Sequence, residues 1–92
     1  MPRMTSLDRK VQILSYIVAY RIAHQYSPSV REIGQATGLA STSTVHGHLE
    51  RLKRAGLIEQ ATCSPRTIRV LRAAWSQYPI SDYLEQWSFD PQ

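Results

Sequence analysis

The densest hydrogen-bonding chemistry of the chain lies at residues 41–54, where four short hydroxyl side chains lead into a segment that ends in basic residues. In a helix, successive side chains are rotated by about 100°. Val45, Leu49 and Leu52 then lie within about 60° of one another, and this spacing predicts a buried seam. His48 falls at the edge of the seam, so we expect it to be packed.

The opposite side of this predicted helix carries small or hydrogen-bonding residues, namely Ser43, Thr44, His46 and Gly47. In the major groove each base pair shows its own pattern of donors, acceptors and methyl groups, which short polar side chains can contact if the helix lies close. Gly47 lowers helix stability by about 1 kcal/mol relative to alanine. It is either a tolerated weak point or a place where the backbone must approach another surface.

Basic and hydroxyl side chains around the same helix are candidates for phosphate contacts: Arg31, Thr42, Lys53, Arg54 and Arg66. The start of a helix carries a partial positive charge that favours an anion. Contacts of this kind orient a protein on duplex DNA without reading its sequence. Each basic residue alone could equally be a solvated surface charge, but their clustering around one helix favours a common role.

The elements that position this helix can be predicted from caps and periodicity. A first helix over about residues 7–24, capped by Thr5 or Ser6, has an apolar stripe of Leu7, Val11, Leu14, Val18 and Ile22. After Pro28, Ser29 and Glu32 form a capping box for a second helix over residues 30–37, which Gly38 ends in a left-handed conformation.

The third helix is predicted from Thr42 or Ser43 to Ala55, between a cap in the hydroxyl run and Gly56. After Gly56 the hydrophobic pattern changes, and residues 57–60 and 67–71 read as two short strands joined by a polar turn. Three helices and a β-hairpin make a mainly α fold with a small sheet (α+β), the winged helix-turn-helix. We expect this domain to span residues 1–72.

Residues 73–92 form an aromatic and acidic tail. Pro79 interrupts any helix that starts at residue 73, and Ser81-Asp82 could cap a short one to about Trp87. We consider two roles for this tail. It joins two copies of the chain or recruits a partner, or it packs within the chain, with Trp75 and Tyr78 covering the first helix.

Charge separates the same two parts. All eleven Lys and Arg residues precede residue 73, whereas three of the seven acidic residues follow it, and the formal net charge is +4. A basic body with an acidic tail favours a polyanionic partner.

Other chemistry has little support. Cys63 is the single cysteine, so no internal disulfide can form. The sequence shows neither an apolar signal segment at its N-terminus nor a stretch long enough for a membrane span, so we expect a cytoplasmic protein. His46 and His48 diverge on a helix and cannot share a metal. No phosphate loop or nucleophile elbow occurs, so we expect no enzyme, cofactor or small-molecule ligand.

Several stretches closely resemble the N-terminal DNA-binding domain of the SOS-response repressor LexA, most of all the form found in Gram-positive bacteria. They are YSPSVREIG at residues 26–34, GLASTSTVHGHL at 38–49, LKRAGLI at 52–58 and SPRTI at 64–68. The likeness covers about residues 5–72. It implies a transcriptional repressor that binds a palindromic operator as a dimer. It adds Ser41 to the base-contacting residues and Ser29 to the backbone-contacting ones.

The chain also departs from that family. LexA continues into a self-cleaving domain with a serine–lysine dyad, which also dimerises it. Here the only Ala-Gly pair is Ala55-Gly56, so we expect no self-cleavage and no dimerisation of that kind. Two half-sites then require another dimer or two separate monomers. The alternative is a protein-interaction module, pairing with a repressor or another partner and showing little DNA specificity of its own.

Overall fold

Three helices and a two-stranded hairpin form the first part of the fold, and two short helices follow. The computed structural model describes residues 6–61 and 66–87, with side chains from residue 9 onward. The elements are α1 (Ser6–His24), α2 (Val30–Thr37), α3 (Thr42–Arg54), β1 (Ile58–Glu59), β2 (Arg69–Val70), α4 (Arg72–Gln77), α5 (Ile80–Tyr83) and the 3-10 turn η1 (Leu84–Gln86). The mainly α winged helix-turn-helix expected from the sequence is confirmed.

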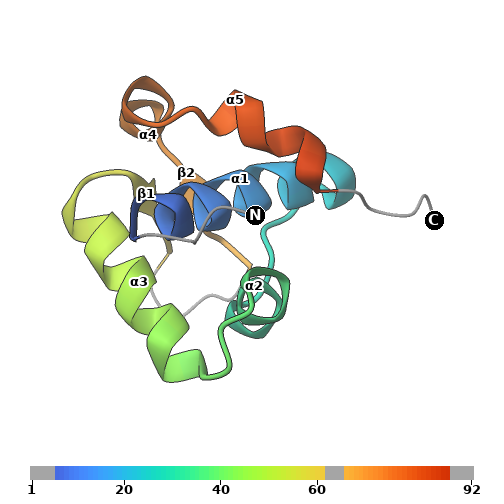
Figure 1. Ribbon diagram of the computed structural model, residues 1–92, viewed down its shortest axis with the longest axis vertical. Helices are drawn as coiled ribbons and strands as arrows, with labels where there is room; N and C mark the ends of the chain where they lie inside the picture. Colours follow the sequence, from blue (N-terminus) through green and yellow to red (C-terminus); the bar gives the residue numbers. More distant parts are fainter. Residues whose placement is uncertain (1–5, 62–65, 88–92) are drawn as a thin grey trace.

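Helix α1 lies at the centre of the molecule (Figure 1). Helices α2 and α3 lie on one side of it, and α4 and α5 on the other, with α2 and α5 both in contact with α1. Strands β1 and β2 are antiparallel, with Ile58 opposite Val70 and Glu59 opposite Arg69.

Helix α2 begins and ends as its caps predict. The Glu32 amide donates to the Ser29 hydroxyl at 3.2 Å, and the Ser29 amide donates to the Glu32 carboxylate at 2.8 Å. Gly38 ends the helix with φ 76°, a left-handed conformation that glycine adopts without steric strain. The capping box and the glycine stop are both confirmed.

Helix α3 shows the predicted seam. Val45, Leu49 and Leu52 are all buried, and the Ser41 hydroxyl accepts the Ser43 amide at 3.1 Å as the N-cap. The helix ends at Arg54, one residue earlier than predicted, and Gly56 follows in a left-handed conformation. One side of α3 is therefore held in the core, which leaves the other side available.

The predicted apolar stripe of α1 is wrong at its last member. Ile13, Leu14 and Ile17 are fully buried, whereas the side chain of Ile22 is 71% exposed. Ile22 lies eleven positions after Val11, which is 2% exposed, so the two side chains differ by only about 20° around the helix. The period places Leu14 and Ile22 on adjoining rows, but the elements beside the last turn of α1 do not reach Ile22.

The hairpin strands are two residues each, shorter than the predicted strands over 57–60 and 67–71. At each end of the hairpin one further hydrogen bond continues the pairing of the two strands, through a side chain at one end and through the backbone at the other. The Ala61 amide donates to the Thr67 hydroxyl at 3.1 Å, and the Leu71 amide donates to the Leu57 carbonyl at 2.8 Å. Two expectations lie outside the described residues: the Thr5 cap and the part of the polar turn that contains Cys63.

The segment after β2 packs on α1. Ala74 and Ile80 are buried in the same core as the first three helices. The Trp87 indole donates to the Ser15 hydroxyl at 2.8 Å and meets the Tyr16 ring edge-on, with 5.0 Å between ring centroids. The predicted short helix begins at Ile80 rather than after a Ser81-Asp82 cap, because Pro79 occupies the cap position, and it tightens into η1 at Leu84.

A close approach between α2 and α3 depends on the absence of a side chain at Gly34. A Cβ atom there would lie 3.1 Å from Val45 Cγ2 and 3.2 Å from the Leu39 carbonyl oxygen. The carbonyl belongs to the backbone of the turn between the helices, so it cannot move without moving the turn. Gly34 therefore sets how closely α3 packs on α2.

We predict that Gly34→Ala is less stable than Gly47→Ala by about 1–3 kcal/mol, the usual penalty of overpacking. Both substitutions gain about 1 kcal/mol of helix propensity. At Gly47, however, the nearest atom to a new Cβ is Arg51 Nη1 at 3.8 Å, an ordinary contact. Urea unfolding of the two variants isolates the steric effect, and equal stabilities would contradict it.

Candidate nucleic-acid interface

The first turns of α3 form a surface edge of small, mostly uncharged residues. Ser41, Ser43, Thr44 and His46 are exposed and Gly47 is half-buried. We call these five residues the reading edge. They lie on a different side of the helix from the buried seam of Val45, Leu49 and Leu52, as predicted. The core therefore holds α3 through the seam, and none of the five residues is part of the core.

Gly47 has no packing requirement within the protein. A side chain at this position would meet only ordinary contact distances, in contrast to Gly34. The neighbours of α3 therefore do not require a glycine at this position, which fits both a tolerated weak point and a backbone that approaches an outside surface.

A hollow between α2 and α3 brings together two residues predicted to contact the DNA backbone, Arg31 and Thr42. It has a volume of about 340 Å³, and Gly34 and Val45 form part of its lining. Arg31 is exposed at the start of α2, and Thr42 is the first residue of α3. The positive end of the α3 dipole and the Arg31 charge therefore meet at one edge, an arrangement that suits an anion.

The far end of α3 carries the other basic side chains. Lys53 Nζ lies 3.0 Å from a Glu50 carboxylate oxygen, and a hydrogen bond from Lys53, together with its charge, lowers the pKa of Glu50. Arg51 Nη2 lies 3.4 Å from His48 Nδ1. Burial and the nearby charges of Arg51, Arg9 and Lys10 lower the pKa of His48, so its half-buried ring is neutral at pH 7.

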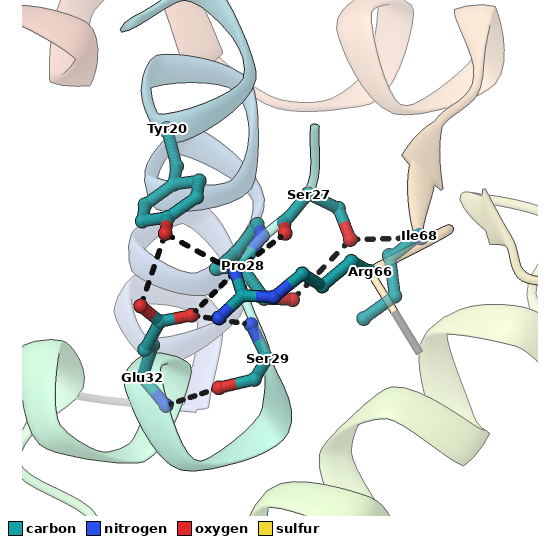
Figure 2. A network of polar contacts seen from close by, with 7 residues as sticks. All are labelled: Tyr20, Ser27, Pro28, Ser29, Glu32, Arg66 and Ile68. Atoms are coloured by element: carbon teal, nitrogen blue, oxygen red, sulfur yellow. Dashed lines mark hydrogen bonds and ion pairs between the residues drawn. The ribbon is translucent and has the colours of Figure 1, made fainter. Parts of the chain in front are cut away.

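Arg66, predicted as a backbone contact of the wing, lies in a polar network at the base of the hairpin (Figure 2). Its Nη1 atom lies 3.0 Å from Glu32 Oε1 and donates to the Tyr20 hydroxyl at 3.2 Å and to the Ser27 carbonyl at 3.4 Å. The guanidinium also lies 5.1 Å from the centre of the Tyr26 ring, within range of a cation–π contact.

Glu32 is the centre of this network (Figure 2). Its Oε1 atom accepts the Ser29 amide and pairs with Arg66, while its Oε2 atom accepts the Tyr20 hydroxyl at 3.0 Å. Close by, the Ile68 amide donates to the Ser27 hydroxyl at 3.1 Å. One carboxylate thus joins α1, the cap of α2 and the residue that leads into β2.

The backbone of Arg66 has φ 60°, a left-handed conformation that is uncommon for a residue with a side chain. It directs the guanidinium back toward the turn between α1 and α2. The side chain remains 42% exposed, because the contacts with Glu32, Tyr20 and Ser27 all use Nη1. A phosphate can therefore still approach it.

The parts of this network that the sequence did not reveal are Tyr20 and Ser27. The spacing of Ser29 and Glu32 predicts the capping box, but nothing in the spacing shows that the same carboxylate reaches residues twelve positions earlier and thirty-four later. Of the remaining predicted residues, Arg31 lies on α2 at the hollow that Thr42, the first residue of α3, also lines, and Lys53 and Arg54 lie at the end of α3.

These elements coincide with a known domain family. The family model of the LexA DNA-binding domain matches residues 3–67 of the chain. The chain belongs to this family. The match covers α1 to α3 and the hairpin up to the residues just before β2, and it ends before α4, so the segment that packs on α1 through Trp87 lies beyond it.

LexA repressors of several bacteria are similar to the chain. That of Exiguobacterium sibiricum is 57% identical over 63 residues, which cover 68% of this chain and 31% of the relative. For Bacillus subtilis LexA the identity is 54%, with coverage of 74% and 34%, and for Bacillus velezensis LexA it is 51%, with coverage of 85% and 38%. The chain spans about a third of the length of these LexA repressors.

Two further features of the LexA-type domain concern the residues that the structure describes. Within residues 6–61 and 66–87, no three His, Cys, Asp or Glu side chains come together as a metal-binding group would require. None of the helices in the same ranges combines the length and apolar character needed to cross a membrane.

The Glu32 network predicts a pH dependence of stability. Burial opposes the charged form of Glu32, but hydrogen bonds from the Ser29 amide, the Tyr20 hydroxyl and the Ser29 side chain, and the Arg66 charge, outweigh it and lower the pKa of the carboxyl. The stabilisation is therefore complete above the unfolded-state pKa of about 4.3 and is lost as the pH falls through the lower folded-state pKa.

We expect Glu32→Gln to flatten the fall in the free energy of unfolding between about pH 5 and pH 3. Urea unfolding at a series of pH values measures this. Glu50→Gln is the control, because its pair with Lys53 is exposed and screened and contributes little. The interpretation fails if the two variants show the same acid dependence.

Proposed function

We propose that the chain is a sequence-specific DNA-binding repressor whose helix α3 enters the major groove. The observation that carries this proposal is the reading edge, which is exposed and small and lies opposite a buried seam in a LexA DNA-binding domain. The relatives are named LexA repressors, and this supports repression as the outcome of binding. They do not favour a protein-interaction module without DNA specificity.

In this proposal the base contacts come from Ser41, Ser43, Thr44, His46 and Gly47. Backbone contacts come from Ser29, Arg31, Thr42, Lys53, Arg54 and Arg66. The second set lies on both sides of the first, because Arg31 and Thr42 flank the start of α3 and Lys53 and Arg54 its end. Contacts on both sides fix the register of the helix, and the short side chains between them can then meet base edges.

Two copies are proposed to bind the two halves of a palindromic operator. Helix-turn-helix dimers bind half-sites about 34–36 Å apart or multiples of this spacing, on one face of the duplex. The protein is proposed to act in the bacterial cytoplasm, where the DNA is, and to act by occupying its site rather than by catalysis.

Selection of preferred duplexes from a random pool tests this function. A recovered palindrome would support both sequence reading and two-copy binding, and a single unrepeated motif would support reading by one copy. Recovery of no motif at all would contradict the proposal.

We predict that His46→Ala lowers the discrimination between the selected duplex and random DNA by about 1–3 kcal/mol, the value of one good base contact. Competition binding at fixed salt measures this difference. The side chain of His46 is exposed, so the thermal unfolding midpoint should not change.

Lys53→Ala is the matched control on the same helix. It should weaken binding to the selected and the random duplex by the same factor, because a phosphate contact is independent of sequence. Equal effects of the two variants on discrimination would show that the division into base and backbone contacts is wrong.

A further inference from the structure

Tyr26 is an exposed aromatic residue that lies outside the hydrophobic core. Its side chain is 45% exposed, although the next two residues, Ser27 and Pro28, are buried. The backbone before it is also fixed, because Gln25 adopts a left-handed conformation with φ 69° and its amide donates to the Arg21 carbonyl at 2.7 Å. The turn between α1 and α2 therefore holds the Tyr26 ring at the surface.

Ring contacts hold Tyr26 from within the chain. The Tyr20 ring meets it edge-on, with 5.8 Å between ring centroids and 65° between ring planes, and the His24 ring lies 5.9 Å away. The Tyr20 and His24 rings are themselves 4.2 Å apart. Three rings from the last turns of α1 and the turn after it therefore form one cluster, in which Tyr26 is the most exposed of the two tyrosines.

Arg66 lies over the Tyr26 ring, with 5.1 Å from Cζ to the ring centre. A guanidinium at this distance is attracted by the negative face of the ring, and its flat shape suits stacking on it. Its Nη1 atom is held at the same time by Glu32, Tyr20 and the Ser27 carbonyl (Figure 2). These contacts leave the donors on Nε and Nη2 for an anion.

We propose that Tyr26 is a positioning residue for DNA binding, which holds the Arg66 guanidinium in place for a phosphate of the duplex. A mobile arginine must be ordered when it binds, and this ordering reduces affinity. A ring on one side and hydrogen bonds at Nη1 limit the motion of the guanidinium before binding. Arg66 is still 42% exposed, so a phosphate can reach it and accept the two parallel hydrogen bonds that arginine favours.

The surroundings of Arg66 favour a backbone phosphate as the occupant. The Glu32 carboxylate also accepts the Ser29 amide, so Arg66 lies beside the start of α2, where the helix dipole is positive. Arg31 is exposed in the first turn of α2 and lines the hollow that Thr42 of α3 also lines. Arg66 therefore extends the proposed backbone contacts from the start of α3, past the start of α2, to the base of the hairpin.

This inference rests on the proposed function and adds to it a residue that acts through Arg66. Binding to a random-sequence duplex tests it, because a phosphate contact is independent of sequence. Arg66→Gln should lower the slope of log association constant against log salt by about 0.9, the contribution of one phosphate. Tyr26→Leu keeps an apolar side chain but removes the aromatic face, and should weaken binding about two- to fivefold, the usual effect of an exposed cation–π contact.

A double-mutant cycle shows whether Tyr26 acts through Arg66. In the Arg66→Gln background, Tyr26→Leu should cause no further loss of affinity, whereas in the Lys53→Ala background its effect should remain in full, since Lys53 is a separate contact on α3. Tyr26→Phe keeps the ring and should bind much as the wild type does. A residue that only stabilises the fold would give the same loss in every background.

Trp75→Leu is the matched control, because Trp75 is a similarly exposed aromatic residue, at 41%, but lies on α4. It should leave DNA affinity unchanged. Thermal unfolding shows that each variant is folded at the temperature of the binding measurement. Tyr26→Met, which also lacks an aromatic face, takes the place of Tyr26→Leu if that variant is unfolded.

Three results would overturn the inference: wild-type affinity in Tyr26→Leu, an unchanged salt slope in Arg66→Gln, or losses from the two substitutions that simply add. The proposed function is tested separately by the selection of duplexes. If no motif is selected while the coupling of Tyr26 and Arg66 is present, only the proposed sequence reading fails. If a motif is selected and the coupling is absent, only this inference fails.

Discussion

The Glu32 carboxylate holds three parts of the molecule at once. It caps α2 through Ser29, accepts the hydroxyl of Tyr20 from α1, and pairs with Arg66 ahead of β2. A carboxylate that is partly removed from water must be hydrogen-bonded to remain charged, and these donors meet that need. This one group therefore links the helix-turn-helix to the residue ahead of β2, and adds to the core contacts of Leu57, Ile58 and Ile68 that pack the hairpin against the helices.

Local features of the sequence allowed the positions of the helices to be predicted well. Interactions within one or two helical turns produce the capping box at Ser29 and Glu32, the left-handed Gly38 and the buried seam of α3. Such interactions can be predicted from the spacing of residue types along the chain. The contact of Arg66 with Glu32 is different, because it joins residues far apart in the chain and depends on an uncommon backbone conformation at Arg66.

Helical periodicity was misleading in α1 for a related reason. The period groups Ile22 with Leu14 and Val18 but cannot show where the covering elements end. Helix α5 and η1 cover Ser15 and Tyr16 through Trp87, and a hollow beside Ile22 remains. Composition indicated an aromatic tail, but it is the contacts of Trp87 with Ser15 and Tyr16 and the burial of Ala74 and Ile80 that show how the segment lies on α1. The roles of the reading edge and the basic residues remain predictions.

The separation between the reading edge and the packed side of α3 has a consequence for how such a domain can change. The spacing of α2 and α3 is set by Gly34 and Val45, and the seam is completed by Leu49 and Leu52, none of which belongs to the reading edge. Exposed positions usually change the free energy of unfolding by less than about 0.5 kcal/mol when they are substituted. New side chains at Ser43 or His46 can therefore be tried without loss of the fold, so under the proposed function the preferred DNA sequence can diverge, or be redesigned, while the scaffold stays the same.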